Sequence, residues 1–438
     1  MTKTRIIRLA EPSQYVAVYN DATMTLSFRS PEKPDDSFTL AGPAHRENAS
    51  PDQPPVGLSR LSLVVSNACN MTCAYCYANL GAYYSPGRLM PADIALKSIN
   101  YLLRHYTGIG HLNFFGGEPT LNEKIIGMVC EYCRFLKQKG RIARTPGFGL
   151  TTNGLHLSDS LLSLLSEYRF SVSVSLDGPP EIHDRLRTKP DGAATFALID
   201  HNVERLRELG FDVEFECTYT MEHYHQNIYI DTLMDFFYDR YRCKTLHCPM
   251  VVVPPGDPRS VPLELREALY AEAIRASVRN LTAGTPKAIS PVKRWLNAMT
   301  AGRPIRHYCP AGDSTLAVNA DGRIYSCFML MNDPAISMGR IDDDAPPQLP
   351  AKLNDYLQLA DKWRHAQCND CWIQSLCYGC LGEDSSRCGK SDYRSSITGT
   401  SAWCDYRRSL VETFLRTLAE EYFALGRSSA PYLYEHVD

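Results

Sequence analysis

Apolar and polar residues alternate with two different periods from Leu58 onward. Short apolar runs rich in β-branched and aromatic residues predict strands, and these runs are Leu61–Val65, His111–Phe115, Gly147–Thr152, Ser171–Leu176, Asp212–Thr218 and Lys244–Val253. Apolar residues spaced along one helix face predict helices at Ala92–Tyr106, Glu123–Lys139, Ser158–Glu167, Phe196–Leu209 and Tyr229–Tyr238. This alternation indicates parallel βαβ units of an α/β fold, in which reactive groups lie at the carboxyl ends of strands.

The segments on either side of this region lack the strand–helix alternation, which indicates further structural units. Residues 1–55 contain a hairpin, with strands at Gln14–Tyr19 and Met24–Phe28, and a polar linker. The α/β region covers 56–255, and a helical bridge over 256–305 includes Leu263–Leu281 and Val292–Met299. Residues 306–405 have few apolar runs and closely spaced cysteines, which is typical of a small domain held by metal. A C-terminal helix and tail occupy 406–438.

The composition excludes some classes of function. Of the 438 residues, 44% are hydrophobic and 22% are charged, as in an ordinary globular protein. The net charge of −3 gives no overall electrostatic basis for binding nucleic acid or an anionic membrane. No apolar run approaches the length that spans a bilayer, and Met1 to Asn20 lack a signal-peptide pattern. We therefore expect a cytoplasmic protein with neither kind of partner.

Sixteen cysteines are many for a chain in a reducing compartment, where disulfides are rare. Their distribution is uneven, which separates candidate ligands from ordinary thiols. Free cysteine is a common core residue, so we interpret the scattered ones as buried structural thiols. These are Cys130, Cys133, Cys217, Cys243 and Cys248.

The first ligand group is Cys69-x3-Cys73-x2-Cys76, directly after the strand Leu61–Val65. Three thiolates provide three of the four ligands of a cubane [4Fe–4S] cluster, so one iron stays open to an exogenous ligand. A structural zinc site normally has four protein ligands, and no fourth Cys or His lies close by. The spacing therefore favours a cluster that does chemistry.

Polar and glycine-rich sequences follow the next strands. Gly116-Gly117-Glu118-Pro119 lets the backbone approach a ligand and places a carboxylate where it could accept from an ammonium group. Asn153, Ser175 and Asp177 also follow strands, and short polar side chains there can bind a ribose or a carboxylate. Turn-forming Asn-Gly and Asp-Gly pairs explain Asn153 and Asp177 equally well. Arg187 could pair with a carboxylate through two hydrogen bonds.

The second ligand group lies near the C-terminus and contains enough cysteines for two four-ligand clusters. Its members are Cys309, Cys327, Cys368, Cys371, Cys377, Cys380, Cys388 and Cys404. A zinc ribbon built on the two Cys-x2-Cys pairs is the alternative.

The motifs of both halves together resemble those of the radical S-adenosylmethionine (radical SAM) superfamily with a C-terminal SPASM domain. Tyr75 before the last cysteine of the first group and the position of Gly116–Pro119 contribute to the likeness. The resemblance implies a partial (β/α)6 TIM-type barrel with a small cysteine-rich iron–sulfur domain. It also implies one cluster that binds S-adenosylmethionine and two auxiliary [4Fe–4S] clusters. The expected S-adenosylmethionine contacts are Gly116, Gly117, Glu118, Pro119, Asn153, Ser175, Asp177 and Arg187.

By the same resemblance, Cys368, Cys371 and Cys377 would join Cys404 at one auxiliary cluster, and the other would use Cys309, Cys327 and Cys380. The sequence departs from the family pattern in two ways. Two residues separate Cys377 from Cys380 where the family usually has three, and Cys388 is an additional candidate. Cys388 could complete the second cluster or exchange roles with Cys404.

The resemblance implies reductive cleavage of S-adenosylmethionine to a 5′-deoxyadenosyl radical, which abstracts a hydrogen from a substrate. Enzymes of this type mostly modify peptide side chains, so we expect a ribosomally made precursor peptide. A cross-link is the preferred outcome, with a cyclophane carbon–carbon bond ahead of a thioether or an ether. A flavodoxin or ferredoxin would donate electrons.

Two alternatives remain open. Formylglycine formation, as in anaerobic sulfatase maturases, needs a base, and Phe328 stands where those proteins have an Asp after the cysteine of Gly-x4-Cys. A non-catalytic electron-transfer protein would produce no deoxyadenosine. No catalytic base can be assigned, and Tyr219, His223, His247 and Tyr325 are treated as packing or surface residues.

Overall fold

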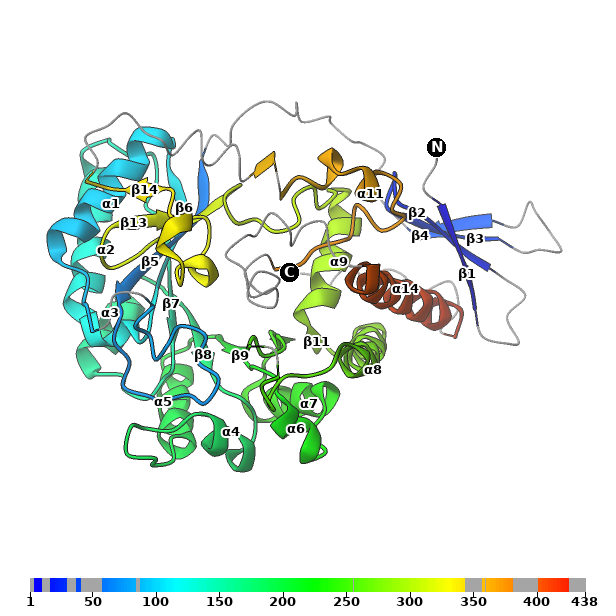
Figure 1. The fold of residues 1–438 in the computed structure, drawn as a ribbon, viewed down its shortest axis with the longest axis horizontal. Coiled ribbons are helices and arrows are strands. Elements are labelled where there is room, and N and C mark those ends of the chain that lie inside the picture. The colour runs from blue at the N-terminus through cyan, green and yellow to red at the C-terminus, as the bar shows by residue number, and fades with distance from the viewer. Residues whose placement is uncertain are drawn as a thin grey trace.

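An eight-stranded sheet forms the centre of the protein in a computed structural model (Figure 1). The structure describes residues 4–9, 16–29, 37–40, 57–83, 87–254, 256–342, 357–358, 360–380 and 401–424. Neighbouring strands pair in the order β14-β13-β12-β5-β6-β7-β8-β9. Five of these strands pair in parallel, each with the next one along the chain. They are β5 (Leu58–Ser66), β6 (Ile109–Gly116), β7 (Gly147–Thr152), β8 (Ser171–Ser175) and β9 (Val213–Glu216). The expected α/β fold is confirmed.

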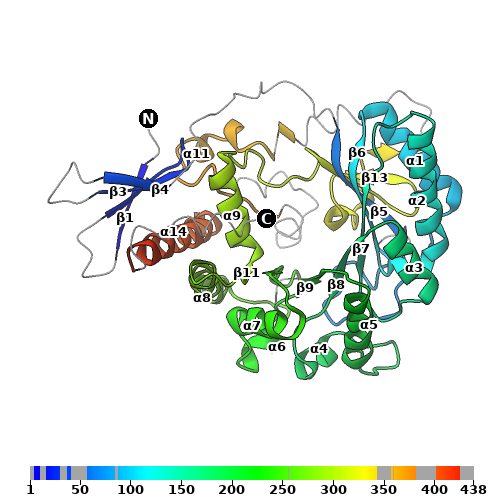
Figure 2. The same cartoon turned by 180° about the vertical axis from the view of Figure 1, so that it is seen from behind.

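Helices cover one face of this sheet, as Figures 1 and 2 show from opposite sides. The helices of this region are α1 (Ala92–His105), α2 (Glu123–Gln138), α3 (Asp159–Glu167), α4 (Pro180–Leu186), α5 (Phe196–Glu208), α6 (Met221–His225) and α7 (Ile230–Tyr241). Alternate strand residues such as Phe114, Leu150 and Val172 are buried in the core. Their neighbours Asn113 and Thr151 point to the other face, where the Asn113 amide donates to the Thr151 hydroxyl. The sheet therefore has an apolar outer face and a polar inner one.

The segment expected to form the sixth strand is less regular than the sequence predicts. Only β10 (Thr245–Leu246) is a strand, and it pairs with β11 (Ala288–Ile289) in a separate two-stranded sheet. Single bridges join His247 to Glu216 and Met250 to Tyr219, so the segment still continues the barrel beside β9. Pro249 has no N–H to donate, which interrupts a regular ladder.

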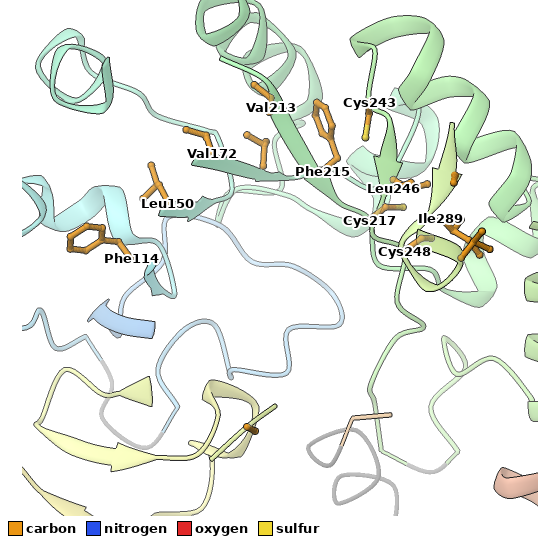
Figure 3. Packing of buried hydrophobic residues seen from close by; sticks show 14 of the residues in the cluster. Phe114, Leu150, Val172, Val213, Phe215, Cys217, Cys243, Leu246, Cys248 and Ile289 are labelled. Carbon is orange, nitrogen blue, oxygen red and sulfur yellow. The ribbon is translucent and has the colours of Figure 1, made fainter. Parts of the chain in front are cut away.

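The cysteines interpreted as structural thiols are all buried, which confirms that interpretation. Figure 3 shows Cys217, Cys243 and Cys248 among apolar side chains, near Phe215 and Ile289. Burial raises the pKa of Cys243 to about 12. Cys217, Cys243 and Cys248 therefore fill the core beside β9 and β10.

The N-terminal hairpin belongs to a larger antiparallel sheet in the order β1-β2-β3-β4. Its strands are β1 (Thr4–Arg8), β2 (Val16–Asn20), β3 (Thr25–Arg29) and β4 (Ser37–Leu40). The predicted pair corresponds to β2 and β3, whereas β4 falls in the stretch expected to be a linker. This sheet lies beside α14 (Ser401–Ala424), away from α1–α3 (Figures 1 and 2).

The C-terminal half both extends the central sheet and forms the cysteine-rich part. After α8 (Leu263–Thr282) and α9 (Ser290–Ala301), strand β12 (Thr315–Val318) pairs in parallel with β5. Strands β13 (Arg323–Tyr325) and β14 (Gly339–Arg340) follow in antiparallel order. Helix α14 packs along α8. The short helices are η1 (Pro119–Asn122), η2 (Phe328–Leu330), η3 (Pro334–Ile336), η4 (Lys362–Arg364) and α11 (Ala366–Asn369).

Within the described ranges, no helix combines the length and hydropathy that crossing a membrane requires.

Candidate active site

The loop that carries Cys69, Cys73 and Cys76 starts at the carboxyl end of β5, and all three cysteines are half-buried. Its backbone is tied to the end of α4 and the residues that follow. The amide of Thr72 donates to the carbonyl of Thr188 at 2.8 Å, and the amide of Ala74 donates to that of Leu186 at 2.8 Å. The loop is thus held by the barrel before any ligand binds.

The glycine turn after β6 lies directly against the start of this loop. The Gly117 amide donates to the Ser66 carbonyl at 2.8 Å, and the Glu118 amide donates to the Ala68 carbonyl at 2.8 Å. A Cβ on Gly117 would lie 2.5 Å from the Ala68 oxygen, which is closer than real contacts allow. Gly116 has φ +157°, and a Cβ on this residue would lie 2.3 Å from the Ser66 carbonyl oxygen. Both positions therefore require glycine for the cysteine loop to pack on β6.

The side chain of Glu118 is fully buried and joins the ends of β6 and β7. Its carboxylate accepts from the Thr152 hydroxyl at 2.6 Å, the Asn153 amide at 2.7 Å and the Thr120 amide at 3.1 Å. Burial raises the pKa of Glu118, while these hydrogen bonds act in the opposite direction. The carboxylate is fully buried in this structure, and its role as an acceptor for a ligand's ammonium group stays a prediction. Pro119 is also buried, where it starts η1.

Asn153 connects the end of β7 to the cysteine loop. Its Nδ2 lies 3.7 Å from the Cys69 sulfur and donates to the Asn70 side-chain oxygen at 2.8 Å. Its Oδ1 accepts from the Leu155 amide at 2.9 Å, which fixes the orientation of the side chain. Asn153 is therefore a neighbour of Cys69 as well as a turn residue.

Asp177 and Arg187 form a buried ion pair that contacts Tyr75, the aromatic residue of the cysteine motif. Arg187 Nε donates to Asp177 Oδ2 at 2.8 Å, and the hydroxyl of Tyr75 donates to the same oxygen. The other carboxylate oxygen accepts from the Thr218 amide at 3.0 Å. The Arg187 guanidinium lies over the Tyr75 ring, 5.4 Å from its centroid. Asp177 therefore holds Arg187 and Tyr75 in place.

Arg187 also acts on the cysteine motif itself. Burial raises the pKa of Cys73, and the charge and hydrogen bond of Arg187 oppose that rise. Burial alone would raise the pKa of Asp177, yet the Arg187 charge brings it below the ordinary value. Ser175, at the end of β8, is half-buried and stands opposite Glu216 in the strand register.

The three cysteines of the loop lie near one another, because the charges of Cys73 and Cys76 act on Cys69 and the charge of Cys76 acts on Cys73. Burial raises the pKa of Cys69 to about 12, and the Glu118 charge adds to this effect. Metal ligation deprotonates such thiols. The side-chain amide of Asn67, two residues before Cys69, is buried, and neither its Nδ2 nor its Oδ1 has a hydrogen-bond partner. Three neighbouring thiols, with unsatisfied buried polar atoms two residues before the first of them, fit a cluster with one open iron.

Among the described residues, no three His, Cys, Asp or Glu side chains are placed to hold a single metal ion.

The C-terminal cysteines that the structure describes fall into two groups. Burial and the neighbouring thiols of Cys377, Cys371 and Cys404 raise the pKa of Cys368 to about 11, so these four lie together. Burial, with a smaller contribution from Cys309, raises the pKa of Cys327 to about 12. Cys380 is half-buried. Cys388 lies outside the described residues.

Near this site lie Phe328, which the sequence analysis named only for the Asp that it replaces, and Glu216, which the sequence analysis missed. Phe328, after Cys327, stacks on Phe115 with ring centroids 4.3 Å apart. Glu216 ends β9 on the polar inner face, opposite the buried Val213 and Phe215, and its charge acts on Tyr77 in the cysteine loop. Strict alternation in the predicted strand Asp212–Thr218 was the signal that could have identified Glu216.

The side chains treated as packing or surface residues occupy such positions. Tyr219, His223 and Tyr325 are buried, and the Tyr219 hydroxyl donates to the Ile228 carbonyl at 2.8 Å. His247 is exposed, with its Nδ1 3.0 Å from the Ser290 hydroxyl.

Comparison with known proteins places this geometry in a family. Residues 63–235 match the Radical SAM superfamily. A cysteine-type anaerobic sulfatase-maturating enzyme of Clostridium perfringens is 29% identical over 172 residues, which cover 37% of this chain and 44% of the enzyme. The chain thus matches less than half the length of this relative.

Two solved structures share the fold. Native anSMEcpe with bound AdoMet has a TM-score of 0.67 at 19% identity, covering 84% of this chain and 100% of that one. Streptococcus suis SuiB bound to the precursor peptide SuiA has a TM-score of 0.52 at 17% identity, covering 79% and 76%. These structures share the partial-barrel fold, and residues 63–235 within it match a radical SAM domain.

Proposed function

We propose that this protein is a radical SAM peptide maturase that installs a cross-link in a ribosomally synthesised precursor peptide. A cyclophane carbon–carbon bond is the preferred product, with a thioether or an ether as further options. The likeness in fold to SuiB, which was solved with a precursor peptide, supports a peptide substrate. A flavodoxin or ferredoxin would supply electrons.

The first cysteine group would hold a [4Fe–4S] cluster with an open iron. When bound there, the cluster and S-adenosylmethionine supply reductive cleavage to a 5′-deoxyadenosyl radical. Backbone groups of Gly116 and Gly117, with Ser175 and Asn153, would position S-adenosylmethionine. Arg187 would provide the positive charge for its carboxylate, because Asp177 keeps the guanidinium in place. The C-terminal cysteines would hold two auxiliary clusters.

The stacking of Phe328 on Phe115 is the observation that favours cross-linking over formylglycine formation. Phe115 directly precedes Gly116, so this aromatic pair lies beside the glycine turn of the proposed S-adenosylmethionine site. An apolar ring occupies the position where the maturase pattern has a basic carboxylate. A ring cannot remove a proton from a substrate.

Formylglycine formation is the second candidate, and Glu216 is the residue that would support it. This carboxylate lies on the inner face at the carboxyl end of β9, next to the end of β8. Glu216 could act as the base that removes a proton from the substrate, which the ring of Phe328 cannot do. The sequence similarity to the sulfatase-maturating enzyme points the same way.

Anaerobic reconstitution with iron, sulfide, S-adenosylmethionine and dithionite tests the proposal. Two substrates would be compared: a candidate precursor peptide from a short open reading frame beside the gene, and a peptide with a sulfatase-type Cys or Ser. Mass spectrometry would measure 5′-deoxyadenosine and peptide products. We expect deoxyadenosine and a precursor peptide that loses two hydrogens without cleavage. Formylglycine in the second peptide only would favour the second candidate, and full clusters without deoxyadenosine would exclude radical chemistry.

Glu216→Gln separates the candidates further. If formylglycine forms and Glu216 is its base, the substitution should reduce that product at least tenfold while deoxyadenosine continues to form. Glu214→Gln is the matched control, because Glu214 lies on the same strand face but nearer the amino end, where it accepts from the Ser173 hydroxyl at 3.0 Å.

A further inference from the structure

Lys362 is a buried cation in the cysteine-rich part of the chain. It begins η4 and is 2% exposed, which is rare for a lysine. Its ammonium donates to the Gln374 carbonyl at 2.7 Å and to the Cys377 carbonyl. These bonds hold the ammonium against the segment that contains Cys371 and Cys377. A buried charge costs several kcal/mol to desolvate, so a compensating negative charge is expected nearby.

The cysteines provide that negative charge once they bind iron as thiolates. Burial lowers the pKa of Lys362, and the negative charges of Cys377, Asp21, Cys368 and Cys371 act in the opposite direction and favour the ammonium form. These three cysteines belong to the group that also includes Cys404. The arrangement therefore fits a negatively charged cluster next to a buried ammonium.

Asp21 is a buried anion that approaches the same segment from the N-terminal sheet. It lies in the turn between β2 and β3, is 1% exposed, and accepts from the Ser375 amide at 2.8 Å. The Ser375 hydroxyl donates to its other oxygen at 3.2 Å. Thus a cation and an anion from distant parts of the sequence are fixed beside one cysteine group. Arg407 and Arg408 of α14 also act on these cysteines but are less deeply buried.

We infer that Lys362 and Asp21 are positioning residues that set the reduction potential of the cluster held by Cys368, Cys371, Cys377 and Cys404, in opposite directions. One-electron reduction adds a negative charge to the cluster and requires no proton. A buried cation stabilises the reduced form, and a buried anion destabilises it. The inference rests on the proposed auxiliary cluster at these cysteines.

The test is a redox titration of the reconstituted full-length chain, followed by electron paramagnetic resonance. Cys69, Cys73 and Cys76 are replaced by Ala so that only the auxiliary clusters contribute. Dithionite supplies the electron. Lys362→Met should lower the reduced-to-oxidised ratio of one signal about tenfold at a fixed potential, equivalent to about 59 mV for a one-electron couple. Asp21→Asn should raise the same ratio, and Lys362→Arg should stay near the parent value.

The second auxiliary signal, from the cluster that includes Cys309 and Cys327, serves as an internal reference and should not move. Lys97→Met on the exposed face of α1 is the matched control. If Lys362→Met leaves both signals in place, or shifts both equally, the inference is wrong. If Lys362→Met loses the cluster, Asp21→Asn is the test. A higher reduced-to-oxidised ratio in that variant supports the inference, and an unchanged or lower ratio overturns it. If the parent binds no iron at these cysteines, the proposed auxiliary cluster fails, a result distinct from an unshifted potential.

Discussion

The two cysteine-bearing regions are held in different ways. The Cys69–Cys76 loop is fixed mainly by backbone hydrogen bonds to nearby parts of the barrel, and glycines allow the close approach. The segment from Cys368 to Cys377 is fixed by side chains from far along the chain. Asp21 bonds to Ser375, and Trp295 Nε1 donates to the Leu376 carbonyl at 3.1 Å.

This difference shows how each region depends on its surroundings. A loop held by the backbone of a parallel barrel keeps its shape without its ligand, because the strands and helices have their own apolar core. A segment held by scattered side chains depends more on its contacts with the N-terminal sheet, and it would depend on the proposed cluster as well. Damage to the first region should therefore remove chemistry, whereas damage to the second should reduce stability and alter electron transfer.

Gly117→Ala should have the largest effect, because the added Cβ would collide with the Ala68 carbonyl and displace the loop before Cys69. We expect loss of the first cluster, measured as lower iron content, and no detectable deoxyadenosine. Auxiliary-cluster signals should persist. Gly127→Ala in α2 is the control, since its Cβ would meet only Leu164 side-chain atoms at 3.7 and 3.8 Å. Unchanged deoxyadenosine formation in Gly117→Ala would contradict this account of the loop.

Asp177→Asn should come next, because it leaves the Arg187 guanidinium buried without its carboxylate. Removing one partner of a buried ion pair costs about 3–5 kcal/mol, which urea unfolding would measure. Asp200→Asn is the comparison, since the Asp200–Arg240 pair is partly exposed. That change should cost about 1 kcal/mol or less. Equal losses in the two variants would show that burial of the pair is unimportant.

Trp372→Ala tests the contact between the cysteine-rich part and the N-terminal sheet. Trp372 meets Tyr19 edge-on at 6.3 Å and lies under the Arg5 guanidinium at 5.3 Å. Loss of both contacts should lower the free energy of unfolding by about 2 kcal/mol. Trp363→Ala is the control, because Trp363 is 44% exposed and should cost less. A smaller effect at Trp372 than at Trp363 would argue against docking through this residue.

Arg5→Ala should have the smallest effect. Its ion pair with Glu412 of α14, at 2.9 Å, is solvent-accessible and therefore worth about 1 kcal/mol or less. The loss should shrink further in high salt, which unfolding at two ionic strengths would measure. A large, salt-independent loss would mean that Arg5 acts mainly through the Trp372 ring.

Much of the barrel could be predicted because its signals are local. The helix over Ala92–His105 and the strand over Gly147–Thr152 follow directly from apolar periodicity. The prediction failed where partners are distant or pairing is irregular. The run Lys244–Val253 is apolar enough for a strand, but it pairs mostly through single bridges. Strand β4 directly follows a stretch rich in Pro and Asp, which favours a linker, and it pairs with β3.

The sequence by itself determined the α/β pattern, the cysteine spacings and the glycine turn, because these depend on residue type and on neighbours close in the chain. Only the tertiary structure decided that Glu118 faces Thr152 and Asn153, that Asp177 holds Arg187 and Tyr75, and that Asp21 reaches Ser375. Each of these contacts joins residues that the fold brings together from different elements. Hydrogen bonds and charge interactions act over a few ångströms, so residue spacing along the chain does not reveal them.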